Sequence, residues 1–139
     1  MDRVIKFRGK ALETDSCYSE KFVHGGISIY NKNNTQDQSE HYFIVETAKD
    51  NLGFITRMVE VKPETVGQFT GLLDKNGKEI YEHDIIQRED GRKDTVVYEL
   101  GEFITKEEGW ELNWLIKHRL GDFGEEITVI GNVYEKEGE

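Results

Sequence analysis

The segment TVGQFTGLLDKNGKEIYEHDIIQ (Thr65–Gln87) decides the predicted fold of this chain. It places Asn76-Gly77 between two segments rich in apolar residues, and this dipeptide adopts positive φ readily, so it is among the strongest short-range signals for a β-hairpin. Glu79–Ile86 follows as a short polar corner that leads into an apolar strand. At that corner we expect the carboxylate of Asp84 to accept backbone N–H groups, as Asp does in Asx turns. The segment indicates how the backbone turns, and it contains no catalytic or cofactor-binding motif.

Alternating apolar and polar residues continue this β pattern to the end of the chain. They predict four strands with tight turns between them: Ile85–Arg88, Asp94–Ile104, Trp110–Ile116 and Ile127–Tyr134. Gly101 is expected to mark a bulge or a sharp bend within the second of these strands. The last strand is apolar on both faces, which predicts a central position in its sheet. Short strands in this order predict a small SH3-like β-barrel, because closure leaves few exposed edges.

The first half of the chain also predicts antiparallel β-structure, with strands at Phe22–Tyr30, His41–Thr47 and Asn51–Lys62. The polar residues 31–40 predict a turn or a mobile loop. Lys62-Pro63 marks the predicted boundary, since the residue before proline is pushed into an extended conformation. The predicted fold class is therefore mainly β with little helix. It has an antiparallel N-terminal sheet subdomain (residues 1–62) and a C-terminal SH3-like barrel subdomain (residues 63–139). Whether the two subdomains share one core stays an open question.

The composition limits the classes of function. The 139 residues suit one domain or two small subdomains, and the single cysteine, Cys17, allows no intrachain disulfide, which fits a reducing cytosol. No apolar signal segment is visible and no apolar run approaches the roughly 20 residues of a membrane span, so we expect a soluble intracellular protein with no membrane partner. The formal charge of −10 opposes binding to a nucleic-acid duplex over most of the surface. Two interpretations of this charge stay open: solubility through self-repulsion, and an acidic face that binds a basic partner.

Three blocks of the sequence resemble the YopX family of phage and prophage proteins: IKFRGKAL (Ile5–Leu12), ETVGQFTGLLDKNGKEIYEHDII (Glu64–Ile86) and VIGNVYE (Val129–Glu135). They follow the family's order and span nearly the whole chain. One departure is His83, where the family usually has glycine. If that glycine serves positive φ, His83 must adopt a left-handed conformation at a cost of about 1 kcal/mol, or the turn must relax. The resemblance implies a mainly β protein encoded by a bacterial virus or prophage and located in the host bacterial cytoplasm; it implies no reaction.

Residue types that carry catalysis or ligand binding form no recognisable site in this sequence. Cys17 and His24 suggest a thiol nucleophile with its base, but a lone cysteine is more commonly an ordinary packed or surface residue. The four histidines are dispersed without metal-ligand spacing. The glycines fit neither of the common phosphate-binding motifs. We therefore predict no catalytic, cofactor-binding or metal-binding residues, and no cofactor.

The candidate interaction residues are Tyr81, Asp84, Trp110 and Trp114, from the second half of the chain, where aromatic residues gather. In small barrels aromatic side chains line grooves for peptides or single-stranded nucleic acid. Packing in the core is the simpler interpretation. A tryptophan that proved exposed would be the first candidate for contact with a partner.

The sequence favours a non-enzymatic interaction module that acts by binding protein or by self-association into a homo-oligomer, since open β edges would otherwise need protection. An alternative is a nucleic-acid-binding accessory protein that uses a local basic patch of Lys6, Arg8 and Lys10. A third interpretation is an enzyme with a dispersed active site.

Overall fold

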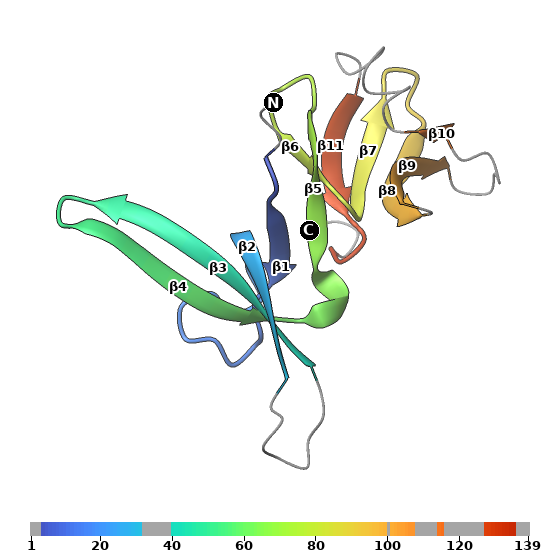
Figure 1. Cartoon of the computed structure of the whole chain (residues 1–139). Helices are drawn as coiled ribbons and strands as arrows, with labels where there is room; N and C mark the ends of the chain where they lie inside the picture. The colour runs from blue at the N-terminus through green and yellow to red at the C-terminus, as the bar shows by residue number, and fades with distance from the viewer. Residues whose placement is uncertain (1–3, 32–39, 100, 108–113, 116–126, 136–139) are drawn as a thin grey trace. The chain divides into compact units, whose positions relative to one another are not determined.

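The computed structural model describes residues 4–31, 40–99, 101–107, 114–115 and 127–135. This part of the chain is mainly β, with two antiparallel sheets and no α-helix (Figure 1). It divides into two compact units: Val4–Gln68, the N-terminal unit, and the residues from Phe69 onward, the C-terminal unit. The helical residues described are those of one 3-10 turn, η1 (Pro63–Thr65). The predicted mainly β fold with little helix is confirmed.

The N-terminal unit is built on a curled antiparallel sheet. Its hydrogen-bonded order is β4-β3-β2-β1-β5, with β1 (Phe7–Lys10), β2 (Phe22–Asn31), β3 (Glu40–Asp50), β4 (Gly53–Val61) and the start of β5 (Gly67–Leu73). The ends of β1 and β4 meet, because Ala11 bridges Val61 and the Lys62 N–H donates to the Lys10 carbonyl at 2.8 Å. The sheet encloses a core of side chains that are at most 3 % exposed: Ala11, Val23, Ile44, Val59 and Val61.

The C-terminal unit contains β6 (Glu79–Tyr81), which pairs with β5, and a five-stranded sheet. The order in that sheet is β10-β9-β8-β7-β11, with β7 (Asp84–Arg88), β8 (Lys93–Glu99), β9 (Glu102–Glu107), β10 (Trp114–Leu115) and β11 (Ile127–Asn132). Every second residue of these strands points to the same side, which gathers the apolar residues on one face. The resulting core contains Ile80, Ile86, Val96, Ile127 and Val129.

The turns of the segment Thr65–Gln87 fold as predicted. The chain reverses between β5 and β6 at Gly77, which has a φ of 80°. At the corner between β6 and β7, the Asp84 carboxylate accepts the Tyr81 N–H at 2.8 Å. His83 adopts the left-handed conformation, with a φ of 77°, and the turn does not relax to avoid it. The His83 N–H donates to the Val96 carbonyl at 2.7 Å. The hydrogen bond holds the strained residue in place.

Two strand predictions in the second half are wrong. The range Asp94–Ile104 is a hairpin and not one strand, because Glu99 pairs with Glu102 and Gly101, with a φ of 81°, lies in the turn. β-branched and aromatic residues occur on both sides of the reversal, in β8 and in β9, so the composition of the range suits one continuous strand and hides the turn. The last strand is not central: β11 lies at one end of the described order, and its Ile130 is 44 % exposed.

The predicted SH3-like barrel is not found among the described residues, whose five-stranded sheet begins at β10 and ends at β11 without pairing the two. The β5–β6 turn instead covers the outer edge of β11. The Lys75 N–H donates to the Ile127 carbonyl at 3.0 Å, and the Asp74 carboxylate accepts the Val129 N–H at 2.9 Å. A turn with an aspartate therefore protects an edge that a further strand would cover in a closed barrel.

The boundary between the two compact units falls between Gln68 and Phe69. Lys62 has the extended conformation expected before proline, with φ −67° and ψ 119°. The predicted division into subdomains of residues 1–62 and 63–139 stays a prediction.

Candidate interaction surface

A long hairpin of the N-terminal unit extends beyond β2, the strand that supports its base (Figure 1). β3 pairs with β4 from Tyr42–Val61 to Asp50–Gly53, whereas its pairing with β2 stops at Gly26–Val45. Residues 46–57, which we call the arm, therefore form a two-stranded ribbon. An isolated two-stranded hairpin is marginally stable at best in water. Contact with another molecule would therefore stabilise the arm.

The tip of the arm carries an exposed leucine. Asp50 Oδ1 accepts the Leu52 N–H at 2.7 Å, and Asp50 then pairs with Gly53, where β4 begins. These two residues supply the turn chemistry, since Asp favours Asx turns and Gly tolerates the φ of 134° found here. Leu52 contributes its backbone N–H to this turn, and the residue is 98 % exposed. Its burial by a partner would be favourable.

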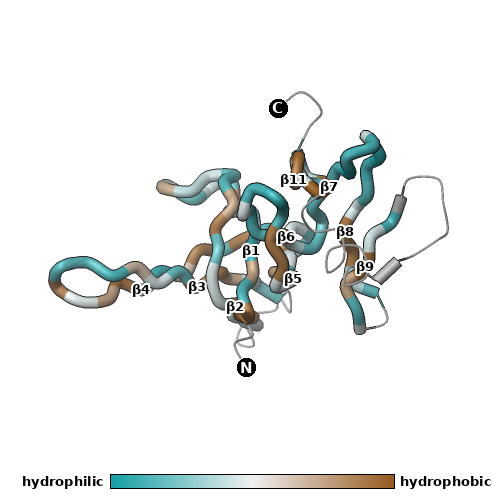
Figure 2. Tube along the Cα trace, turned by 90° about the horizontal axis from the view of Figure 1, so that it is seen from above, coloured by the Kyte–Doolittle hydropathy of each residue, from teal (hydrophilic) through white to brown (hydrophobic). Residues whose placement is uncertain are grey.

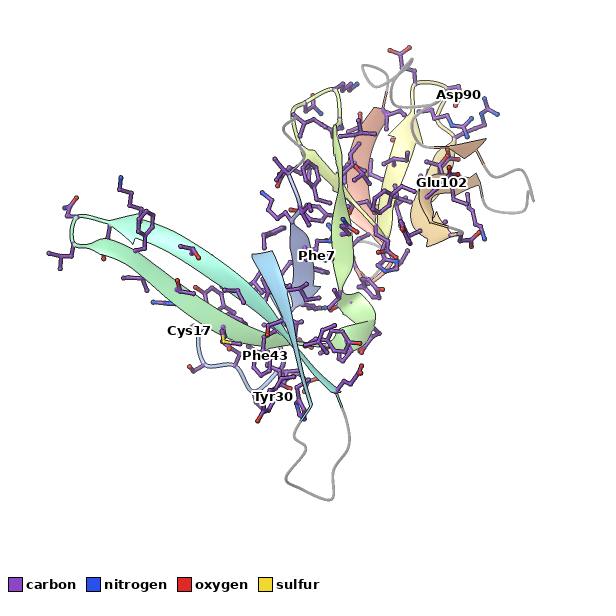
Figure 3. The ribbon with its side chains drawn as sticks, in the orientation of Figure 1. Phe7, Cys17, Tyr30, Phe43, Asp90 and Glu102 are labelled. Carbon is purple, nitrogen blue, oxygen red and sulfur yellow. The ribbon has the colours of Figure 1, made fainter. Side chains whose placement is uncertain are left out.

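Exposed apolar side chains continue from the tip along one face of the hairpin, here called the outer face. Cross-strand partners share a face, so Val45 lies beside Met58 and, two rows further out, Lys49 lies beside Phe54. Phe54 is 73 % exposed and Met58 is 57 % exposed. The buried Ile44 lies on the opposite, inner face. Apolar segments recur along β4 in Figure 2, and side chains stand on both sides of the ribbon in Figure 3.

The inner face is braced at the base of the arm by the loop that precedes β2. The Tyr18 hydroxyl donates to Glu46 Oε2 at 3.1 Å and accepts a hydrogen bond from Arg57 Nη1 at 3.1 Å. Asp15 Oδ1 accepts the Tyr18 N–H at 2.6 Å and so fixes the loop. Glu46 and Arg57 are the first cross-strand pair of the arm. The brace therefore orients the arm at its base and leaves the outer face open.

The interaction residues predicted from the sequence lie elsewhere. Tyr81 and Asp84 are 2 % and 1 % exposed, and they hold the corner between β6 and β7. Trp110 lies outside the described residues. Trp114 belongs to β10, opposite Thr105, and its side chain is not among those described. A contact between any of these four residues and a partner stays a prediction.

Sequence reasoning missed Leu52, Phe54 and Met58 as surface candidates. It placed a strand at Asn51–Lys62; β4 (Gly53–Val61) confirms the strand, whereas Asn51 and Leu52 lie in the turn before it. Period-two alternation identifies two faces, however, and it does not reveal whether another layer covers each face. The signal that was available is Asn51-Leu52-Gly53, where an apolar residue occupies a turn position that polar residues usually take.

One of the three side chains in the basic patch considered for nucleic acid is buried. Arg8 is 7 % exposed and its guanidinium lies 5.0 Å from the centre of the Phe22 ring, while Lys6 and Lys10 are half-buried. Among the described residues, no three His, Cys, Asp or Glu side chains are placed together to hold a metal ion. The same part of the chain contains no helix of the length and apolarity needed to cross a bilayer.

Comparison with known proteins identifies a family model that matches the chain and a solved structure with a similar fold. The family model described as YopX protein matches residues 6–137. The crystal structure of protein EF1440 from Enterococcus faecalis is similar, with a TM-score of 0.56 and 19 % sequence identity over 96 % of each chain. At that identity the likeness concerns the fold alone. No curated protein matches the chain.

Proposed function

The chain belongs to the YopX family, and from this premise we propose that it is a phage- or prophage-encoded interaction protein that binds another protein through the outer face of its arm. The family resemblance supports an origin in a bacterial virus or prophage and a location in the host cytoplasm. The proposed role is non-enzymatic, since binding through the arm requires no reaction.

The observation that carries the proposal is the exposure of large apolar side chains on an unsupported ribbon. Leu52, Phe54 and Met58 are 98, 73 and 57 % exposed, and all three lie on or next to the arm. Contiguous exposed apolar residues mark interaction sites more reliably than single ones do. Aromatic residues and methionine are also enriched in the buried centres of protein interfaces.

The expected affinity follows from the size of this surface. Full burial of a Leu, Phe or Met side chain contributes roughly 1.5–3 kcal/mol, so three of them contribute about 5–9 kcal/mol before costs. Association costs an estimated 4 kcal/mol or more in lost translational and rotational freedom. Side chains alone therefore give weak binding, and backbone hydrogen bonds to the partner would be needed for more.

Site-specific photo-cross-linking in bacterial cells that carry the parent phage or prophage tests the proposal. A photoreactive residue replaces Phe54 in one variant and Leu73 in the matched control, because Leu73 is a strand residue of similar exposure (52 %) in the C-terminal unit. We expect a discrete protein adduct from position 54, identified by mass spectrometry, and none of comparable yield from position 73. Equal yields from the two positions would contradict the proposal, and a nuclease-sensitive adduct would favour nucleic-acid binding instead.

A further inference from the structure

We propose that the partner of the arm is a second copy of this chain, joined by antiparallel pairing of the two β4 edges about a two-fold axis at Thr56. The inference rests on the proposed function, because it names the partner of the arm and joins it along the β4 edge that borders the outer face. It is carried by three observations: an unprotected edge, a register that matches the side chains, and a local balance of charge.

The outer edge of β4 has neither a proline nor a bulge, two features that normally prevent strand pairing. β4 contains nine residues without proline, and its register with β3 runs without a shift from Val61 to Gly53. Within the described chain, other segments meet this edge only at its base, where Ala11 bridges Val61 and the Leu12 N–H donates to the Glu60 carbonyl at 3.2 Å. Long, regular and apolar edge strands of this kind readily pair with other chains.

The backbone groups available for pairing belong to the even-numbered residues of the arm. Glu60 directs its carbonyl to the outer edge, as its bond from Leu12 shows. Backbone groups of an antiparallel strand alternate between its two sides, so Phe54, Thr56 and Met58 direct their N–H and C=O groups outward as well. A two-fold axis at Thr56 pairs Thr56 with itself and Phe54 with Met58 of the second copy. All of these pairs use outward-facing groups.

The side chains favour this register over its neighbours. It gives an apolar row on the outer face, in which Met58 of one copy, flanked by its own Val45, lies opposite Phe54 of the other. An axis one residue further along would place Arg57 opposite Arg57, and like charges directly opposite one another destabilise a sheet. An axis one residue earlier would pair Phe54 with Thr56 and place Met58 opposite Leu52 at the tip of the other hairpin. Thr–Thr and aromatic–apolar cross-strand pairs are both favourable.

The charge distribution also permits two copies to approach at the arm. The whole chain has a formal charge of −10, which repels other copies over most of the surface. In residues 46–57 the charges of Lys49 and Arg57 balance those of Glu46 and Asp50, so the formal charge is zero. A strongly basic partner would be expected to bind a more acidic surface than this one.

Sedimentation velocity of full-length protein over a concentration series tests the pairing with a matched pair of variants. Thr56→Lys places two lysines opposite each other at the axis. The control, Thr47→Lys, adds the same charge to the cross-strand neighbour of Thr56 on the same exposed face. We expect wild type and Thr47→Lys to form a dimer with rising concentration and Thr56→Lys to lose it at matched concentrations. A wild-type chain that stays monomeric, or a dimer that survives equally in both variants, would overturn the proposal.

Disulfide trapping gives an independent readout of the register. In a Cys17→Ser background, Thr56→Cys brings two sulfurs together, since hydrogen-bonded strand partners have Cα atoms about 5.5 Å apart, within the range a disulfide spans. The control Thr47→Cys places its sulfurs three strand spacings apart, about 14 Å, which is too far. Oxidation should cross-link Thr56→Cys and not Thr47→Cys. Equal cross-linking, or none at position 56, would overturn the register. A position-54 photo-adduct with a different protein, without self-association, would refute this inference and leave the proposed function standing.

Discussion

Replacing Asp74 by asparagine tests how the β5–β6 turn is fixed to β11. Asp74 is 6 % exposed; its Oδ1 accepts the N–H groups of Asn76 at 2.8 Å and Lys78 at 2.9 Å, and its Oδ2 accepts the Val129 N–H at 2.9 Å. Burial raises the pKa of Asp74, but the three backbone N–H donors and the nearby Lys78 outweigh burial, so the pKa lies below its ordinary value. The folded chain therefore favours the charged carboxylate.

The magnitude follows from the lost acceptor. Asparagine keeps one oxygen and presents an NH₂ donor in place of the other. With the oxygen on the turn side, the buried Val129 N–H loses its acceptor, which costs about 1–3 kcal/mol. The two remaining bonds lose their charge assistance, at about 1 kcal/mol each. We expect Asp74→Asn to lower the free energy of unfolding by about 3–5 kcal/mol, a large share of the 5–15 kcal/mol typical of native proteins.

Urea unfolding at pH 7, followed by tryptophan fluorescence, measures this loss. The matched control is Asp90→Asn, because Asp90 also accepts a turn N–H, that of Arg92 at 3.0 Å, but its side chain is exposed. We expect no measurable loss for the control. An Asp74→Asn variant as stable as Asp90→Asn would refute the argument that the buried carboxylate fixes the turn.

Acidification gives the second part of this test. Since the pKa of Asp74 is lower in the folded chain than in the unfolded one, its contribution is fully present above the ordinary Asp pKa of about 4. It is lost as the pH falls through the folded pKa. The difference in unfolding free energy between wild type and Asp74→Asn should therefore stay constant from about pH 5 to 8 and shrink below about pH 4. A difference that persists unchanged in acid would contradict the assignment.

Two further predictions concern packing inside each unit. Gly25→Ala should destabilise the chain by about 2–3 kcal/mol, because the added Cβ would lie 2.1 Å from the Val45 carbonyl oxygen. Gly26→Ala, whose Cβ has its nearest neighbour at 4.0 Å, should change stability by less than about 0.5 kcal/mol; equal melting temperatures for the two variants would count against this. Asp94→Ala should cost about 3 kcal/mol, because the Arg88 guanidinium donates to both oxygens of a carboxylate that is 2 % exposed. The double variant Arg88→Met/Asp94→Leu should recover most of that loss in urea unfolding, and a double variant as unstable as the single one would show that the ion pair is not the cause.

Local turn chemistry was predictable from the sequence because it depends on single residues. Gly77 reverses the chain, Asp84 accepts a backbone N–H at its corner, and His83 takes the strained φ that its family position implied. Strand order and edge positions depend on contacts between distant segments. The sequence marked Gly101 as a bulge or sharp bend but not as a full reversal of the chain, and it missed the edge position of β11, although these segments were recognised as β.

The candidate surface was less predictable than the fold, for a related reason. The composition predicted a strand here, but only the register shows that the pairing of β3 with β2 stops at Val45 and leaves the arm without a third strand. Tyr81 was selected for its aromatic ring, but it lies in a three-residue strand whose last two residues, Ile80 and Tyr81, are both buried. Exposure is a property of the assembled sheet, and a single sequence does not record it.

Amide hydrogen exchange along β4, measured at low and at high protein concentration, tests the central claim most directly. The amides of Phe54, Thr56 and Met58 face the outer edge, whereas those of Ile55 and Arg57 face β3. Pairing of the arm predicts that exchange at the first three amides slows as concentration rises, by a larger factor than at the other two, which are already bonded to β3. Exchange at the three outward amides that is fast and independent of concentration would contradict it.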